Sequence, residues 1–222
     1  MSIVTQMFPD PSNGPEMRLR EFGLSIEVFH RAFRPGLNHA RGRSGAALGS
    51  AKANDLYQDT SEQIRLLLLS NKWASQTINH QPRLIHPDGL MAIVISSATG
   101  VGSTHPKVMP ITGRKGRATH DSIARATNPK HSTLEIPGFE EVLADAHNPA
   151  EAPLWMALHE LTEHGLNLEL SKPADYRADG SVDDFSERIL IPSIRLDGDF
   201  SAFKADDGDD EFDVPVVPLE PR

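Results

Sequence analysis

The chain has 222 residues, of which 38% are hydrophobic, with 17 prolines, 16 glycines and no cysteine. That length accommodates one full domain with tails, and the lack of cysteine excludes a disulfide framework, thiolate zinc sites and a cysteine nucleophile. No stretch approaches the roughly 18 apolar residues of a membrane-spanning helix, and no secretory signal is recognisable. We therefore expect a soluble, cytoplasmic protein without a membrane partner.

The net charge of −9 is distributed unevenly along the chain. Residues 1–135 carry 16 Lys and Arg against 10 Asp and Glu, whereas residues 136–222 carry 6 against 21. Charge polarised in this way favours a nucleic-acid or protein partner for one half. The alternative is that the two halves interleave in one fold and neutralise each other.

The N-terminal third predicts an irregular start followed by a helix. Residues 1–15 are rich in Pro and Gly and are expected to be irregular. Residues 16–33 predict a helix, which Pro35-Gly36 should end, because apolar residues recur there at three- and four-residue steps: Leu19, Phe22, Ile26, Phe29 and Phe33. The stretch from residue 35 to 53 is expected to be a loop, basic enough to contact phosphate through Arg41 and Arg43.

A second helix over residues 60–70 is followed by a hairpin. Asp59 and Glu62 resemble a capping box before an apolar stripe. Leu90–Ile95 is a short apolar run preceded by the turn-forming residues 87–89, which is typical of a strand covered on both faces. Residues 83–96 therefore predict a hairpin at the centre of a small, largely antiparallel sheet.

A Gly-rich loop, residues 97–104, follows that strand. The phosphate-loop pattern requires Lys after the second Gly, but Gly102 precedes Ser103. The dinucleotide pattern requires a third Gly at a helix start, where His105-Pro106 stands instead. A simple strand-exit loop explains the glycines better.

The next stretch combines basic residues with a short helix over residues 119–127. Basic side chains ahead of a helix can hold a phosphate together with the free N–H groups of its first turn. The candidate phosphate contacts here are Arg114, Lys115, Arg117, Arg125 and Lys130. A solvated surface loop is the alternative interpretation.

The C-terminal half predicts helices over residues 139–146 and 151–164, then strands over 166–170 and 185–191. Leu154, Leu158 and Leu161 would share one face of the second helix, and Gly165 would follow its end. The second strand is expected to end at Pro192. Residues 197–222 have the acidic, Pro-rich composition of a disordered tail.

No catalytic signature emerges from the polar residues. His159 and His164 are five residues apart, so they would diverge on a helix, whereas a zincin needs a spacing of four. His120-Asp121 is an isolated pair, and no Gly-x-Ser-x-Gly motif occurs. We predict no catalytic residue, metal or cofactor, and we lean away from an enzyme.

These observations predict an α+β protein with an irregular segment at 1–15, a single domain at 16–196 and an acidic tail at 197–222. The leading hypothesis is a non-enzymatic accessory protein with two basic segments, residues 31–43 and 114–130, that contact nucleic acid. The acidic tail would either recruit a protein partner, through Asp206, Asp207, Asp209, Asp210, Glu211 and Phe212, or shield the basic surface.

Two alternatives remain open. The acidic region could mimic nucleic acid and dock on a basic protein, as an inhibitor or assembly factor. A metal-dependent hydrolase could instead use His120, Asp121, His159 or Glu163.

Overall fold

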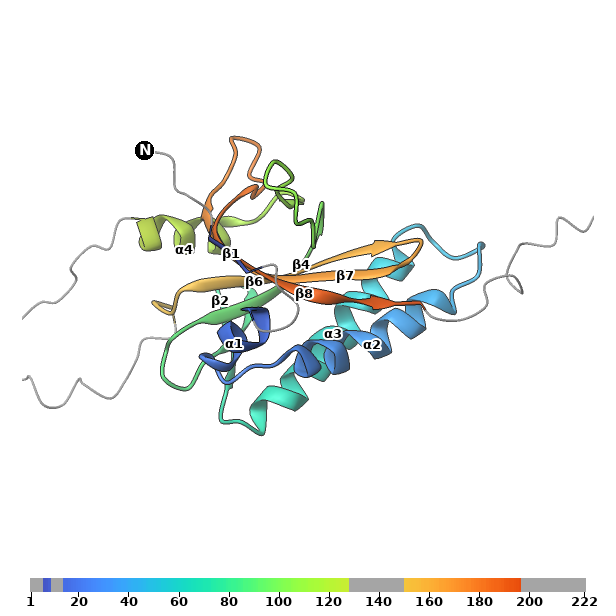
Figure 1. The fold of residues 1–222 in the computed structure, drawn as a ribbon, viewed down its shortest axis with the longest axis horizontal. Coiled ribbons are helices and arrows are strands. Elements are labelled where there is room, and N and C mark those ends of the chain that lie inside the picture. The colour runs from blue at the N-terminus through green and yellow to red at the C-terminus, as the bar shows by residue number, and fades with distance from the viewer. Residues whose placement is uncertain (1–5, 9–13, 128–149, 197–222) are drawn as a thin grey trace, which may run out of the picture.

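A computed structural model describes residues 6–8, 14–127 and 150–196, which form a mixed, mostly antiparallel sheet with helices on both faces (Figure 1). The strand order is β1-β8-β7-β6-β4-β3-β2, and β5 pairs with β4 outside this path. Only β1–β8 and β4–β6 pair in parallel among the described strands. The predicted α+β class is confirmed, although the sheet is larger than expected.

The strands are β1 (Gln6–Phe8), β2 (Ala74–Ile78), β3 (Gln81–Ile85), β4 (Ala92–Thr99), β5 (Ile111–Thr112), β6 (Leu154–Thr162), β7 (Gly165–Asp175) and β8 (Asp184–Arg195). The helices are α1 (Gly14–Arg20), α2 (Ile26–Arg41), α3 (Ala51–Leu69) and α4 (Arg117–Thr127). None of these helices is long and apolar enough to cross a membrane.

The predicted hairpin is confirmed as β3 and β4, which pair antiparallel. β4 lies between β3 and β6 in the sheet. Ile93 contributes to the core beneath α1–α3, and Val94 contributes to the core on the α4 side. Because both faces of β4 are covered, its sequence is a continuous apolar run rather than an alternating one.

Helices α1, α2 and α3 cover one face of the sheet (Figure 1). The helix expected over residues 16–33 is in fact two helices. Between them Gly23 takes a positive φ of 64°, and Ser25 then caps α2 by accepting a hydrogen bond from the Val28 N–H at 3.3 Å. The predicted helix at 60–70 is present, but α3 begins at Ala51.

The expectation that Pro35-Gly36 ends the helix is wrong, since α2 continues to Arg41. A Cβ atom at Gly36 would lie 3.0 Å from both the Cα and the carbonyl oxygen of Leu56 on α3. The glycine therefore allows α2 and α3 to pack closely, and the tertiary contact outweighs the local helix-breaking tendency. The expected loop from residue 35 to 53 shrinks to residues 42–50.

The predicted helix at 151–164 is also wrong, because Leu154–Thr162 is strand β6. Met156 and Leu158 belong to the core on the α4 side, while Trp155 and Ala157 belong to the core beneath α1–α3. A strand buried on both faces lacks alternation, so its leucines mimicked helical spacing.

Gly165, expected after the end of that helix, instead opens β7. A side chain there would collide with the carbonyl of Ile194 in the neighbouring strand. The two expected strands at 166–170 and 185–191 are confirmed within β7 and β8.

β8 continues past Pro192, where it was expected to end. Leu168 pairs with Ile191 and Leu166 with Ile194, so the proline lies at a register shift. A bulge accommodates proline because its missing N–H costs no ladder hydrogen bond there.

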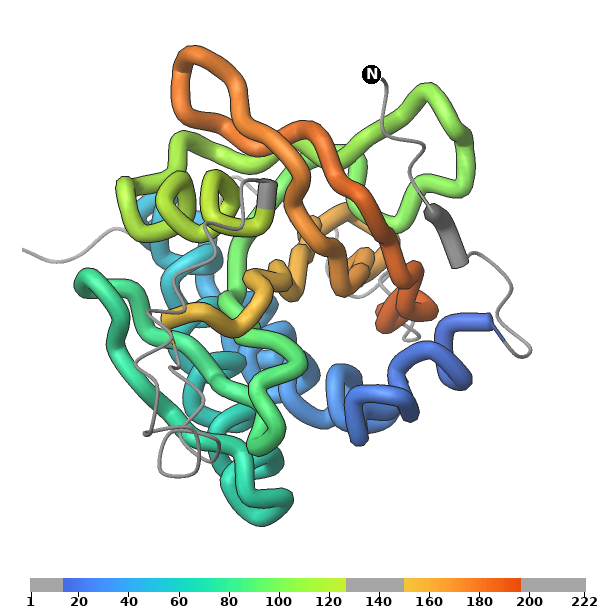
Figure 2. The backbone as a smooth tube through the Cα atoms, turned by 90° about the vertical axis from the view of Figure 1, so that its left-hand side faces the viewer, coloured from blue at the N-terminus to red at the C-terminus, as the bar shows by residue number. Residues whose placement is uncertain are grey.

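The other face of the sheet carries α4, the loop 100–116 and the turn that joins β7 to β8 (Figure 2). The predicted helix at 119–127 is confirmed, with α4 beginning at Arg117. Residues 6–8 form β1 within the segment expected to be irregular. The predicted helix at 139–146 and the acidic tail lie outside the described residues.

Candidate nucleic-acid interface

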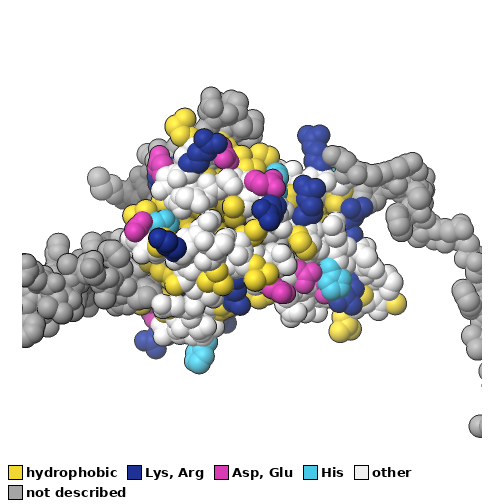
Figure 3. Space-filling model, turned by 90° about the horizontal axis from the view of Figure 1, so that it is seen from below, with side chains coloured by type: hydrophobic (Ala, Val, Ile, Leu, Met, Phe, Trp, Pro, Cys, Tyr) yellow, Lys and Arg dark blue, Asp and Glu magenta, His cyan; other side chains and the backbone are white. Residues whose placement is uncertain are grey.

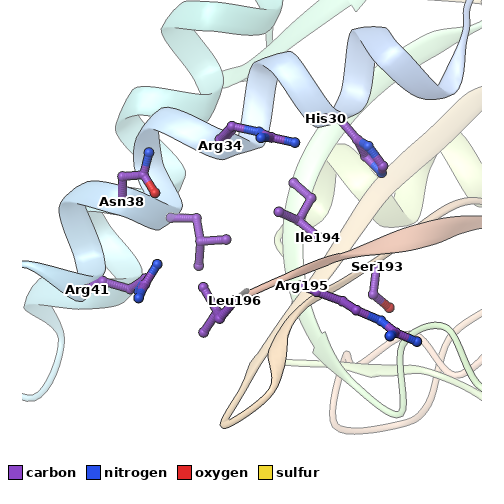
Figure 4. Close-up of a pocket in the computed structure, with 9 residues that line it drawn as sticks. His30, Arg34, Asn38, Arg41, Ser193, Ile194, Arg195 and Leu196 are labelled. Carbon is purple, nitrogen blue, oxygen red and sulfur yellow. The ribbon is translucent and has the colours of Figure 1, made fainter. Parts of the chain in front are cut away.

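A groove of about 460 Å³ runs between one side of α2 and the end of β8 (Figure 4). Polar residues of α2 line it at steps of four, four and three along the helix, which places them on one face: His30, Arg34, Asn38 and Arg41. We call this surface, with Leu37 and residues 193–196, the α2 groove.

The floor of the α2 groove is apolar and fixed in place. Leu37 and Ile194 are buried beneath it, and the Nε2 of His30 donates to the Pro192 carbonyl at 2.7 Å. This hydrogen bond ties α2 to β8 directly. Ser193 and Arg195 point away from α2 (Figure 4), and the Ser193 hydroxyl donates to Asn167 Oδ1 at 2.8 Å.

A second hollow of about 670 Å³ adjoins the α2 groove, and Asn38, Arg41 and Leu196 line both. This second hollow adds Arg43 and Lys52 from the connection between α2 and α3. Each of the two lies in the volume range of about 300–1,000 Å³ typical of ligand sites. They form one continuous depression along the end of the helix layer.

The charge of this depression is positive. Neither the α2 groove nor the adjoining hollow is lined by an Asp or Glu among the described residues. Arg34 and Lys52 are exposed and form no ion pair with a described carboxylate, whereas Arg43 is held by Asp55 at 2.6 and 2.7 Å. The face of the helix layer in Figure 3 shows several Lys and Arg side chains on its right-hand half, the side toward which α2 runs in Figure 1, with a few Asp and Glu side chains among them.

The second set of predicted contacts lies around α4, on the opposite face of the sheet (Figure 1). We call this set, Arg114, Lys115, Arg117 and Arg125, the α4 face. Arg117 pairs with Asp121 at 3.5 Å, and Arg125 donates to the Ser122 hydroxyl at 3.0 Å. Asp121 also lines the hollow of about 620 Å³ beside the first turn of α4.

Two cations of this region point into the protein. Lys115 donates from Nζ to the Ser96 hydroxyl, and burial lowers the pKa of its ammonium group. Arg83 is 1% exposed, donates to Gln81 Oε1 and to the Ala118 carbonyl, and has no described partner for Nη1. Burial lowers the pKa of Arg83 as well, and Arg125 adds a repulsive contribution.

The predicted nucleic-acid contacts therefore fall into two groups rather than one patch. Arg41 and Arg43 lie at the α2 groove and the hollow beside it, and Arg114, Lys115, Arg117 and Arg125 lie across the sheet from them. Lys130 and the predicted partner site lie outside the described residues, the latter comprising Asp206, Asp207, Asp209, Asp210, Glu211 and Phe212.

Backbone N–H groups of the Gly-rich loop after β4 are bound by carboxylates of the protein itself. The N–H of Val101 donates to Glu160 Oε2 at 3.0 Å, and the N–H of Gly102 donates to Glu169 Oε2 at 2.8 Å. Backbone N–H groups that bind phosphate in a phosphate loop are here bound to carboxylates. The loop leaves β4 and is held to β6 and β7 by these hydrogen bonds.

The histidines considered for metal chemistry are not brought together. His120 on α4 stacks on Tyr176 with ring centroids 4.0 Å apart, whereas His159 packs against Phe33 of α2, across the sheet. Within residues 6–8, 14–127 and 150–196, no group of three His, Asp or Glu residues is placed to hold a metal ion.

His159 is a core residue. It is 4% exposed, and its Nδ1 has no hydrogen-bond partner among the described residues. Burial, together with the charge of Lys115, lowers the pKa of His159 to about 4, so the ring is neutral at pH 7.

His30, Arg34 and Asn38 were not singled out from the sequence, although the predicted basic segment 31–43 contains Arg34 and Asn38. The signal was present, because His30, Arg34, Asn38 and Arg41 recur at helical steps. It was obscured by ending the helix at Pro35, which assigned Arg41 to a loop and broke the row.

No protein-family model, curated protein or solved structure matches this chain. A functional conclusion therefore has to come from the charges and contacts of the chain itself.

Proposed function

We propose that this chain is a non-enzymatic, cytoplasmic accessory protein that binds the phosphate backbone of nucleic acid in the α2 groove. The observation that supports this most is the pair of adjoining hollows lined by Arg34, Arg41 and Lys52, with no described carboxylate in their lining. Cations gathered on an exposed surface attract phosphate, and the counterions of the phosphate are released on binding.

The geometry suits a strand backbone better than a small ligand. Arg34 and Arg41 are separated by about 10 Å along α2 at 1.5 Å per residue, and one DNA strand carries a phosphate about every 3.4 Å along its axis. The row of α2 therefore spans about three phosphates. Because such contacts do not read bases, we expect binding with little sequence preference.

The test is a charge-reversed double variant, Arg34→Glu with Arg41→Glu, titrated against fluorescently labelled single-stranded and duplex DNA and RNA. We expect the affinity to fall at least about tenfold near 50 mM salt. The slope of log affinity against log salt should fall by about 0.7 for each single-strand phosphate that the variant no longer neutralises.

A matched control separates local contacts from overall charge. Lys72→Glu with Lys107→Glu makes the same change in net charge at two exposed residues that line neither hollow and lie outside both predicted basic segments. The control should bind within about twofold of the wild type. Equal weakening by both double variants, or none by the first, would sink the proposal.

The protein partner predicted for Asp206–Asp213 belongs to the same proposal, and a nucleic-acid mimic is its alternative. Mimicry would have to rest mainly on the tail, because several carboxylates of the folded domain are engaged internally. Glu160 and Glu169 accept from loop N–H groups, and Glu187 pairs with Arg18 at 2.6 Å. Deleting residues 198–222 separates the two: nucleic-acid binding that persists without the tail favours the groove, and a chain that binds no nucleic acid with or without the tail favours the mimic.

A further inference from the structure

The acidic tail leaves the folded domain at the α2 groove. Leu196 is the last described residue, and it lines both the groove and the adjoining hollow. The next residue, Asp197, begins a segment that carries nine Asp and Glu against two Lys and Arg through residue 222. The most acidic part of the chain thus begins beside a depression whose described charged residues are all basic.

The charges of the two partners are complementary. The depression presents Arg34, Arg41 and Lys52 with no acidic residue in its described lining, and the Asp206–Asp213 segment supplies six carboxylates within eight residues. That segment also contains Phe212, and the adjoining hollow offers Leu161, a strand-end leucine that is 40% exposed. An acidic segment with an aromatic residue fits a basic groove with an apolar side.

The distances allow the contact. Asp206 follows Leu196 by ten residues, which span at most about 35 Å when fully extended. The cationic row of α2 is about 10 Å long, so every part of it lies within reach. A tethered segment also has an effective concentration in the millimolar range, so weak charge pairing is enough to populate the contact.

We propose that the acidic segment Asp206–Asp213 occupies the α2 groove of its own chain and competes there with nucleic acid. The competition rests on the proposed function, whereas the docking itself does not. If the groove is about nine-tenths occupied, the apparent affinity for nucleic acid falls about tenfold. Docking through exposed charges should also weaken with salt.

The docking test uses the full chain and a spin label. Because the chain contains no cysteine, Ala205→Cys provides a single labelling position beside the acidic segment. Paramagnetic broadening of backbone amides is compared between this protein and one that also has Asp206, Asp207, Asp209, Asp210 and Asp213 changed to Asn and Glu211 to Gln. The two proteins have the same chain between Leu196 and the label, so broadening caused only by closeness to Leu196 is the same in both.

We expect strong broadening at Arg34, Asn38 and Arg41 with the acidic tail, and little with the neutral tail or in about 0.5 M salt, where screening is short-ranged. Equal broadening by the two tails would overturn the proposal. Mixing labelled, NMR-silent chains with unlabelled ¹⁵N chains provides the second check, since broadening there would show a tail that docks on another copy and would overturn docking within one chain.

A nucleic-acid titration of the same two proteins keeps the two proposals distinct. The neutral-tail chain should bind single-stranded DNA about tenfold more tightly at low salt. Tail-dependent broadening without DNA binding by either chain would refute the proposed function and leave the docking standing. Equal DNA affinities without tail-dependent broadening would refute the docking and leave the proposed function standing.

Discussion

The two basic surfaces of this protein differ in what their cations already contact. On the α4 face, Arg117 pairs with Asp121, Arg125 bonds Ser122 and Lys115 is directed inward to Ser96. At the α2 groove and the hollow beside it, Arg34 and Lys52 form no ion pair with a described carboxylate, and no described acid lines the depression. Three of the four α4-face cations thus have described partners, whereas Arg34 and Lys52 have none on the α2 side, where Arg43 is held by Asp55.

The difference arises from the architecture beneath each surface. Beside its apolar core, the α4 side of the sheet contains the fully buried Glu169–Arg188 pair at 2.6 Å and the loop N–H groups that Glu160 and Glu169 bind. The core beneath α1–α3 is apolar, and Arg18 and Arg43 on that side are held by Glu187 and Asp55. Arg34 and Lys52 are exposed there and form no ion pair with a described carboxylate.

The largest expected effect lies in the buried Glu169–Arg188 pair. Glu169→Gln keeps the shape but leaves Arg188 buried without a counter-charge, which should lower the free energy of unfolding by about 3–5 kcal/mol. Urea denaturation measures it. Arg177→Ala removes a more exposed pair with Asp183 on the same side and should cost about 0–1 kcal/mol. Equal losses would show that the buried pair has no special role.

A second effect concerns pH and the α2 side. Folded His159 has a pKa of about 4, below its unfolded value of 6.5. Unfolding therefore takes up a proton between those values, and stability falls as pH falls through that window. The loss from this residue between pH 7 and pH 4 is roughly 3 kcal/mol.

Thermal or urea unfolding across that range measures it. The His159→Leu variant should lose less stability on acidification than the wild type, and His164→Gln, at an exposed histidine, is the control. Parallel curves for all three proteins would contradict the assignment.

A third effect probes the helix pair that carries the α2 groove. Gly36→Ala places a methyl group 3.0 Å from the Leu56 backbone and should cost about 1–3 kcal/mol through overpacking. Gly45→Ala is the control, because a Cβ there meets nothing within 4 Å. Urea denaturation compares the two, and a Gly36→Ala protein as stable as the control would mean that α2 and α3 adjust freely.

The smallest effect is expected on the α4 face. If phosphate binds in the α2 groove, Arg114→Glu with Arg117→Glu should change nucleic-acid affinity by less than about threefold and leave the salt slope unchanged, because the α4 face lies across the sheet from the groove and Arg117 already pairs with Asp121. Fluorescence anisotropy, run beside the Arg34→Glu and Arg41→Glu variant, measures it. A loss of tenfold or more would move the interface to the α4 face.

Sequence patterns predicted a strand or turn correctly where the residues of that element alone carried the pattern. The turn at residues 87–89 and the apolar run to Ile95 predicted the β3–β4 hairpin, and the alternation of Leu166, Leu168 and Leu170 predicted β7. The prediction failed at β6, where burial on both faces removed the alternation, and at Pro35, where packing overrode a helix breaker.

The sequence by itself determined the α+β class, the hairpin and the polarisation of charge along the chain. The tertiary structure decided the surroundings of each charge. Arg34 and Arg117 have equivalent charges in the sequence, yet one lines a groove without a described acid and the other lies beside Asp121. These surroundings depend on side chains that are far apart in the sequence but meet in the fold. They also depend on α2 continuing through Gly36, which its packing against α3 allows.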